Sequence, residues 1–148
     1  MKDGEFVNSA GIKIGTVVVD GYGNFMGKDY FGNLFNYGTI DLATVDAFGR
    51  LTNTGSVANI KTVIVTGVGN NQGWLTNSGK ANIETAIVNR SGYLQNNTAS
   101  KIESVTVHSG GTLINSDTNT RIEKAFLYGG VITNEAYNST VSTDLDTM

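Results

Sequence analysis

The stretch Gly111-Thr112-Leu113-Ile114-Asn115 is one copy of a five-residue phrase, Gly-x-apolar-x-Asn, and the fold follows from how that phrase recurs. Complete copies of the phrase begin at Gly4, Gly32, Gly49, Gly73, Gly92, Gly111 and Gly130, and a degenerate copy begins at Gly23. The last four complete copies are spaced by 19 residues each time. A fixed period of this length is the sequence signature of a repeat protein, in which stacked units share one continuous core.

A second phrase, Ile-x-x-small/apolar-x-apolar, precedes most copies of the first. Its copies begin at Ile14, Ile40, Ile60, Ile83, Ile102 and Ile122. The alternation of apolar and polar residues, as at Val105 and Val107, has a period of two and is rich in β-branched residues. That pattern predicts a strand with one buried face. We find no apolar stripe of helical period and expect essentially no helix.

Each repeat therefore reads as strand, turn, strand, turn. Units this short cannot bury a core alone, but stacking them in register at about 4.8 Å aligns their apolar side chains into interior columns. The predicted fold is an all-β solenoid of about six to seven coils, forming a single domain over residues 1–148. The predicted columns are Val17, Ala43, Val63, Ala86, Val105 and Ala125; Val19, Val45, Val65, Val88, Val107 and Leu127; and Leu34, Leu51, Leu75, Leu94, Leu113 and Ile132.

The asparagine that closes the phrase is interpreted as structural. Identical amides stacked along a solenoid hydrogen-bond up and down the stack while they cap backbone groups in the turns. The predicted ladder consists of Asn36, Asn53, Asn77, Asn96, Asn115 and Asn134. The glycine that begins the five-residue phrase, called here the phrase glycine, suits a position that needs positive φ or a tight corner.

The repeat is interrupted in three places. Residues 67–72 are rich in Gly and Asn and are predicted to form a protruding loop. Residues 20–37 form an irregular, aromatic-rich insertion, and residues 141–148 lose the phrase and are expected to fray. The chain opens inside a copy of the repeat, which suggests a segment of something longer.

Composition favours polar, uncharged recognition. The 148 residues include no Cys, only 16% are charged, and the net charge is −3. No disulfide or thiolate metal site is available. The chain has no basic stripe, so we expect no nucleic-acid partner. It has no apolar run long enough for a membrane-spanning helix, and the abundance of Asn, Thr, Ser and Gly favours an extracellular or carbohydrate-facing role.

Carboxylates recur at one repeat position and raise the question of a metal or acid/base site. Glu84, Glu103 and Glu123 share this position, with Asp41 and Lys61 in the equivalent slots. Stacked carboxylates suit Ca²⁺ or an acid/base pair. The neighbouring cations favour a salt-bridged, solvated face instead. We therefore expect no metal, no cofactor and no catalytic residue, and no enzymatic activity.

Candidate binding residues lie where the phrase varies. The position after the phrase glycine is occupied by Arg50, Trp74 and Tyr93 in successive copies, which predicts an outward stripe. Such a stripe either protects the sheet face by cation–π and aromatic stacking or offers a platform for sugar rings or another solenoid. The insertion adds a second candidate surface. Its candidate residues are Tyr22, Tyr30 and Tyr37.

Two segments resemble known passenger repeats. Gly110-Gly111-Thr112-Leu113, with its 19-residue period, is similar to the repeats of self-associating autotransporter adhesins. Leu51-Thr52-Asn53-Thr54-Gly55-Ser56-Val57 resembles the repeats of filamentous-haemagglutinin-like proteins from two-partner secretion. The resemblance covers roughly residues 4–140. It implies a right-handed parallel β-helix, a secreted or cell-surface location in bacteria, membership of a longer passenger, and an outer-membrane translocator as partner.

The expected function is structural and adhesive. The flat sides of the β-helix would bind host glycans or proteins, or associate with copies of the same chain. Two alternatives stay open: a polysaccharide lyase or hydrolase built on a β-helix, and a scaffold that polymerises end to end. A carboxylate cluster facing the loop at residues 67–72 would favour the enzyme, and concentration-dependent assembly would favour the scaffold.

Overall fold

The structure is a computed structural model that describes residues 4–25, 28–135 and 140–143. Every regular element in this part of the chain is a β-strand. None of these residues belongs to a helix that is long and apolar enough to cross a membrane.

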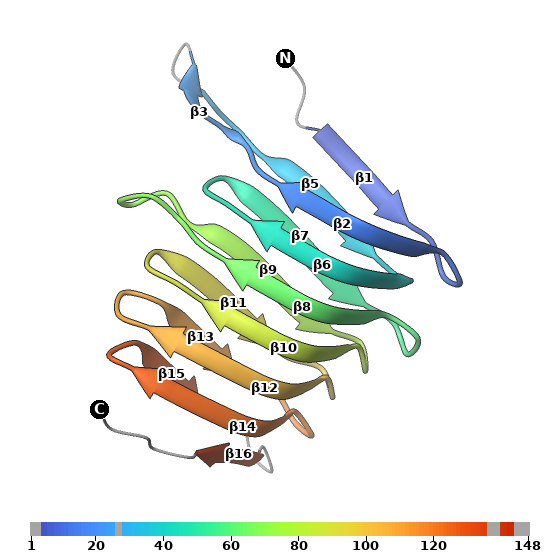
Figure 1. Cartoon of the computed structure of the whole chain (residues 1–148), viewed down its shortest axis with the longest axis vertical. Coiled ribbons are helices and arrows are strands. Elements are labelled where there is room, and N and C mark those ends of the chain that lie inside the picture. Colours follow the sequence, from blue (N-terminus) through green and yellow to red (C-terminus); the bar gives the residue numbers. More distant parts are fainter. Residues whose placement is uncertain (1–3, 26–27, 136–139, 144–148) are drawn as a thin grey trace.

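Two parallel sheets of seven strands each lie face to face and form the molecule (Figure 1). Strands that carry the Gly-x-apolar-x-Asn phrase form the first, called here the Gly–Asn sheet. It consists of β1 (Gly4–Asn8), β5 (Gly32–Asn36), β7 (Gly49–Thr54), β9 (Gly73–Ser78), β11 (Gly92–Asn96), β13 (Thr112–Asn115) and β15 (Val131–Asn134). The second, called here the isoleucine sheet, consists of β2 (Lys13–Val19), β6 (Thr39–Val45), β8 (Asn59–Val65), β10 (Asn82–Val88), β12 (Lys101–His108), β14 (Arg121–Tyr128) and β16 (Thr140–Thr143).

Successive strands alternate between the two sheets, so the chain winds as a solenoid. The winding is right-handed, as predicted, and the coils descend from the N-terminal to the C-terminal end (Figure 1). Equivalent repeat positions are direct partners in the ladders. Leu51 pairs with Leu75, for example, and Val63 pairs with Ala86. The predicted all-β parallel β-helix is therefore confirmed.

The core consists of the predicted columns and one further column. Leucines of the Gly–Asn sheet face alanines and valines of the isoleucine sheet, and the central members have no exposed surface. The first residue of the isoleucine phrase adds a column that the sequence analysis left out. Its fully buried members are Ile40, Ile60, Ile83, Ile102 and Ile122.

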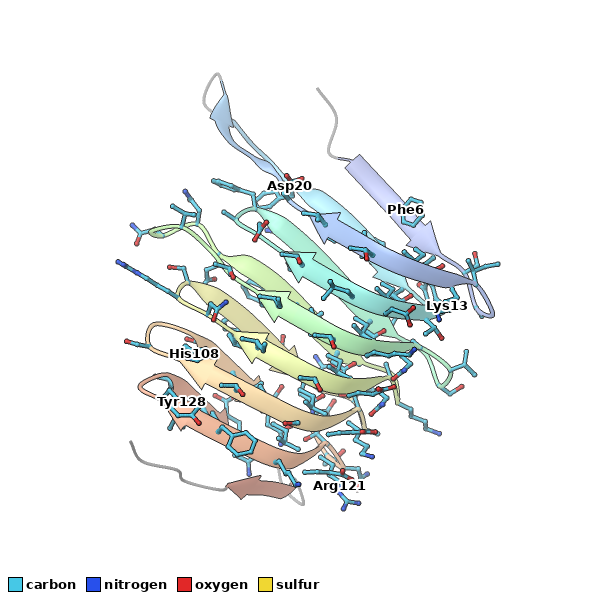
Figure 2. All side chains as sticks on the ribbon, viewed as in Figure 1. Phe6, Lys13, Asp20, His108, Arg121 and Tyr128 are labelled. Carbon is cyan, nitrogen blue, oxygen red and sulfur yellow. The ribbon has the colours of Figure 1, made fainter. Side chains whose placement is uncertain are left out.

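The number of fully cored coils is slightly smaller than predicted. Five leucines of the Gly–Asn sheet are buried, which gives five complete turns rather than six to seven. They are Leu34, Leu51, Leu75, Leu94 and Leu113. Phe6, the register partner of Leu34 in the first coil, keeps 55% of its surface exposed (Figure 2). Ile132, at the other end, is only partly buried.

A continuous ladder of asparagine side chains runs along the inside of one corner. Each Nδ2 donates to the Oδ1 of the asparagine in the next coil, at 2.7–2.9 Å. All six predicted asparagines take part, and Asn8 adds a seventh member at the N-terminal end. The same amides donate to backbone carbonyls at this corner, as from Asn36 to Gly38 O at 3.0 Å and from Asn77 to Lys101 O, at the start of β12, at 2.9 Å. All of these side chains except Asn134 are buried, so their bonds replace those that water would otherwise supply.

Close backbone approach explains the phrase glycine, and positive φ does not. A Cβ at Gly92 would lie 2.3 Å from the carbonyl oxygen of Val65 in the coil before it, and one at Gly49 would lie 2.0 Å from that of Val19. Neither glycine has positive φ. The residue just before the glycine often does, as at Phe48 and Ser91. The corner is thus a left-handed residue followed by a glycine.

The interruptions differ in structure. Within residues 20–37, β3 (Tyr22–Phe25) and β4 (Lys28–Tyr30) form a small antiparallel hairpin, while β5 continues the regular stack. The loop at residues 67–72 is closed by an antiparallel bridge between Val68 and Asn71. Residues 141–143, which were expected to fray, belong to β16 and pair with β14. Residues 144–148 lie outside the described part of the chain.

Candidate functional site

The predicted stripe occupies the outer face of the Gly–Asn sheet. Arg50, Trp74 and Tyr93 are direct register partners on β7, β9 and β11. They point outward because the leucines beside them in each strand point into the core and successive side chains alternate across a sheet. Parallel stacking therefore places one cation and two aromatic rings in a single row.

The two aromatic residues of this row pack against each other with their rings tilted. The ring centroids of Trp74 and Tyr93 are 4.1 Å apart, with an angle of 34° between the ring planes. The indole Nε1 of Trp74 donates to Thr76 Oγ1 at 3.2 Å, which fixes the ring orientation. Burial raises the pKa of the Tyr93 hydroxyl above its ordinary value, and the negative charge of Glu135 raises it further.

Arg50 makes its cation–π contact with Phe31. The guanidinium carbon of Arg50 lies 3.8 Å from the centroid of the Phe31 ring, and Phe31 in turn packs against Phe48 with centroids 6.1 Å apart. An exposed pair of this kind is worth about 0.5–1 kcal/mol. The contact places the guanidinium over the face of the Phe31 ring.

Two shallow hollows meet at Arg50 and Trp74. One, of about 360 Å³, is lined by Asn33, Phe35, Arg50, Leu51, Thr52, Trp74 and Thr76. The other, of about 210 Å³, is lined by Phe31, Phe48, Arg50, Asn70, Asn71, Gln72 and Trp74. Aromatic rings, amides, hydroxyls and one cation line this pair of hollows, called here the Arg50–Trp74 site. No carboxylate is among these lining residues.

Sequence reasoning missed part of this site. It did not single out Phe48, and it placed Phe31 only within the insertion, not beside Arg50. The amides of Asn70, Asn71 and Gln72 were recognised only as loop residues. The length of that loop was the one sequence feature that could have indicated its role, because the loop residues line a hollow together with Arg50 and Trp74.

The three candidate tyrosines of the insertion do not gather at one place. Tyr22 and Tyr30 are partners in the β3–β4 hairpin, which precedes β5, and their side chains lie outside the described residues. Tyr37 follows β5, where its backbone N–H donates to the Asn8 carbonyl at 2.8 Å. The five residues of β5, at about 3.3 Å each, separate the hairpin from Tyr37.

Three carboxylates of the isoleucine sheet, Asp41, Glu103 and Glu123, are paired with cations, whereas Glu84 accepts a hydrogen bond from Asn59 Nδ2 at 2.8 Å. Asp41 lies between Lys13 at 2.9 Å and Lys61 at 2.8 Å, and Glu123 contacts Lys101 at 3.1 Å. Hydrogen bonds from Lys61 and Lys13 lower the pKa of Asp41, and Asp41 in turn raises the pKa of Lys61. Figure 2 shows Lys13 and Arg121 along the same side of the stack.

This charged row matches the salt-bridged face expected from the sequence. Within residues 4–25, 28–135 and 140–143, no three His, Asp or Glu side chains lie close enough together to hold a metal ion. The single histidine, His108, stacks on Tyr128 of the next coil with ring centroids 5.6 Å apart (Figure 2). The Arg50–Trp74 site is thus separate from the charged row and lies on the other sheet.

No protein-family model, curated protein or solved structure matches this chain.

Proposed function

We propose that this chain is a structural and adhesive segment of a bacterial secreted or surface-displayed adhesin, and that it binds host glycans or proteins through the outer face of the Gly–Asn sheet. The observation that carries the proposal is the Arg50–Trp74 site. It combines a closely packed Trp–Tyr pair, a guanidinium packed on the Phe31 ring and uncharged polar side chains on a rigid sheet. Aromatic and arginine side chains of this kind dominate the energy of protein interfaces.

The solenoid supports this role mechanically. Every strand is held by ladder bonds to its neighbours, so the outer face is preorganised and loses little entropy when a ligand binds. A rod that displays weak polar contacts along its length gains avidity when several of them engage one surface. The resemblance to autotransporter and two-partner-secretion passengers supports an extracellular location and an outer-membrane translocator as partner.

The residues that line the Arg50–Trp74 site favour an adhesive function over a catalytic one. A polysaccharide lyase or hydrolase would need acids and bases in a groove beside the loops. On the isoleucine sheet, away from this site, Asp41, Glu103 and Glu123 are paired with cations of the same sheet. The residues that line the two hollows beside the loop at 67–72 include no carboxylate.

Binding of the protein to host surfaces tests this proposal. Beads coated with the chain are expected to adhere to epithelial monolayers or mucin-coated plates, and a Trp74→Ala/Tyr93→Ala variant is expected to adhere several-fold less. The matched control is Tyr128→Ala, which removes an exposed aromatic residue from the isoleucine sheet. If the folded wild-type chain adheres no better than uncoated beads, the proposal is wrong.

End-to-end assembly is a second candidate function, because the N-terminal coil leaves apolar side chains exposed. Phe6, Val7 and Val18 keep 55%, 47% and 58% of their surface exposed, and residues of β1 and β2 line an open hollow at this end. In such an assembly, a coil of a second molecule would stack on this N-terminal coil and cover its apolar side chains. Sedimentation velocity over a hundredfold concentration range is expected to show growing particles, and Phe6→Lys with Val18→Lys is expected to suppress them.

A further inference from the structure

The chemistry of the Arg50–Trp74 site narrows the class of ligand. We propose that it is a subsite for an acidic saccharide, a pyranose that carries a carboxylate, whose ring packs on Trp74 and whose carboxylate binds Arg50. This inference rests on the adhesive function proposed above and names its ligand class. The larger hollow, of about 360 Å³, lies at the lower end of the volume range of small-molecule pockets, and the smaller hollow adjoins it at Arg50 and Trp74.

Arg50 provides the charge that such a ligand needs. The ion pairs in the described part of the chain use other cations, on the isoleucine sheet, and Arg50 has no acidic partner among the described residues. Its one described contact is the face-on packing against Phe31, which leaves the N–H groups at the edge of the guanidinium available. A planar guanidinium matches a carboxylate by two parallel hydrogen bonds.

Trp74 provides the apolar surface. Tyr93 covers one face of the indole, and the side chain lines both hollows together with Arg50. A flat aromatic ring with a hydrogen-bonded Nε1 is an amphipathic, low-entropy contact surface. The apolar C–H face of a pyranose fits against such a ring, and its hydroxyls then point toward the polar rim.

That polar rim consists of uncharged side chains. Asn33 and Thr52 lie on one side of Arg50, and Asn70, Asn71 and Gln72 of the loop lie on the other. Amides and hydroxyls both donate and accept hydrogen bonds, as sugar hydroxyls do. Such a rim beside an aromatic ring and a cation suits the alternating apolar and hydroxyl-bearing surfaces of an acidic saccharide.

Long-range electrostatics give Arg50 its selectivity. The whole chain carries a net charge of −3, so acidic ligands are not attracted to its surface in general. Because Arg50 is a cation and no carboxylate lines the two hollows, acidic ligands are attracted at this site. One cation is too few for the multiple phosphate contacts of a nucleic acid.

Titration calorimetry with defined trisaccharides tests the inference. The probes are a sialyl-lactose, the same compound with its carboxylate converted to an amide, neutral lactose, and a sulfated lactose. For the wild-type chain we expect sialyl-lactose to bind at least tenfold more tightly than the amide or lactose. We also expect this preference to shrink at high salt, because the ion pair is exposed.

Variants separate the two contacts. Arg50→Gln is expected to remove the preference for the carboxylate and leave binding of lactose unchanged, whereas Trp74→Leu is expected to weaken binding of every saccharide. The matched control is Arg90→Gln, another exposed arginine, which is expected to bind as the wild type does. Trp74→Phe keeps an aromatic ring and provides a test should Trp74→Leu fail to fold, which circular dichroism would reveal.

Each outcome decides the inference. Equal affinity for sialyl-lactose and its amide, a full preference in Arg50→Gln, or binding of the sulfated sugar alone would overturn it. If the chain adheres to host surfaces but binds no acidic saccharide, the ligand class is wrong and the adhesive function stands. If it binds neither surface nor saccharide, both are wrong.

Discussion

At the residue scale, the glycine that begins each Gly-x-apolar-x-Asn motif is visible in the sequence, but its physical cause is visible only in the structure. Sequence alone leaves two explanations for a recurrent glycine, positive φ and a tight corner, and it does not say which atoms make the corner tight. The choice depends on the carbonyl of the preceding coil, which is many residues away along the chain. The structure selects the close contact, since the Cβ of any other residue would overlap that carbonyl.

A pair of alanine substitutions tests this explanation. Gly92→Ala is expected to lower the free energy of unfolding by about 1–3 kcal/mol, because its Cβ would lie 2.3 Å from Val65 O. Gly15→Ala is the control, since a Cβ there has no atom within 4 Å. Urea denaturation of both variants measures the difference. Equal stability of the two would contradict the close-contact explanation.

The asparagine ladder allows a second residue-scale prediction. Asn96 donates to Asn115 at 2.8 Å and accepts from Asn77 at 2.9 Å and from Ser100 Oγ at 2.6 Å. Asn96→Ala leaves Asn115 Oδ1 without this donor and takes one of several partners from Asn77 and from Ser100, and a buried group left unpaired costs about 1–3 kcal/mol.

Chemical denaturation of Asn96→Ala is therefore expected to show a loss of roughly 2–5 kcal/mol. The exposed loop residue Asn70 supplies the control, and Asn70→Ala is expected to change stability by less than about 0.5 kcal/mol. A loss in Asn96→Ala as small as that of the control would mean that the ladder is not a stabilising element.

At the scale of the element, the isoleucine sheet carries the charged row that its sequence predicts. Period-two strands in register bring every repeat position into a column, so Asp41, Lys61 and Glu84 become neighbours across coils. Their separation along the chain is irrelevant once the register is known. This part of the surface follows from the repeat alone.

The pH dependence of stability tests the charged row. Lys61 and Lys13 lower the pKa of Asp41, so its contribution is present above the ordinary carboxyl pKa and is lost as the pH falls through the lowered value. Thermal unfolding is expected to show a smaller loss of stability on acidification in Asp41→Asn than in the wild type. High salt is expected to reduce this difference, because the pairs are exposed. Identical acid profiles would contradict the assignment.

Loops and insertions are the elements that the repeat does not predict. The hairpin of β3 and β4 and the bridge between Val68 and Asn71 depend on local pairing outside the 19-residue period. Because Phe31 and the amides at 70–72 reach the Arg50–Trp74 site from these interruptions, sequence reasoning found the row on the sheet and missed the surroundings that complete the site.

At the scale of the whole molecule, nearest-neighbour stacking makes stability uneven along the rod. Central coils have a neighbour on each side and a fully buried core, whereas Phe6 and Ile132 belong to coils that are less well covered. The sequence predicted the fold because the phrase repeats faithfully. The predicted number of complete coils was too high because the motif copies that contain Phe6 and Ile132 match the repeat in sequence, but their apolar side chains are not fully covered.

Hydrogen exchange measures this gradient. Amides of β8, β10 and β12 are expected to exchange most slowly, and those of β1 and β2 are expected to exchange at least tenfold faster, since arrays of repeats open from their ends. Mass spectrometry of peptides from each coil gives the profile. Uniform protection along the rod would show that the solenoid unfolds as one cooperative unit instead.

The asparagine ladder also gives the rod an electrical direction. Every side-chain amide in it points the same way, with Nδ2 toward the C-terminal coils and Oδ1 toward the N-terminal ones. Aligned amide dipoles polarise one another and add along a row, so the ladder places partial negative charge at Asn8 and partial positive charge at its far end. Reversing one amide would set oxygen against oxygen on one side and N–H against N–H on the other. The seven side chains therefore keep a single common orientation, and the two ends of the rod are electrostatically different.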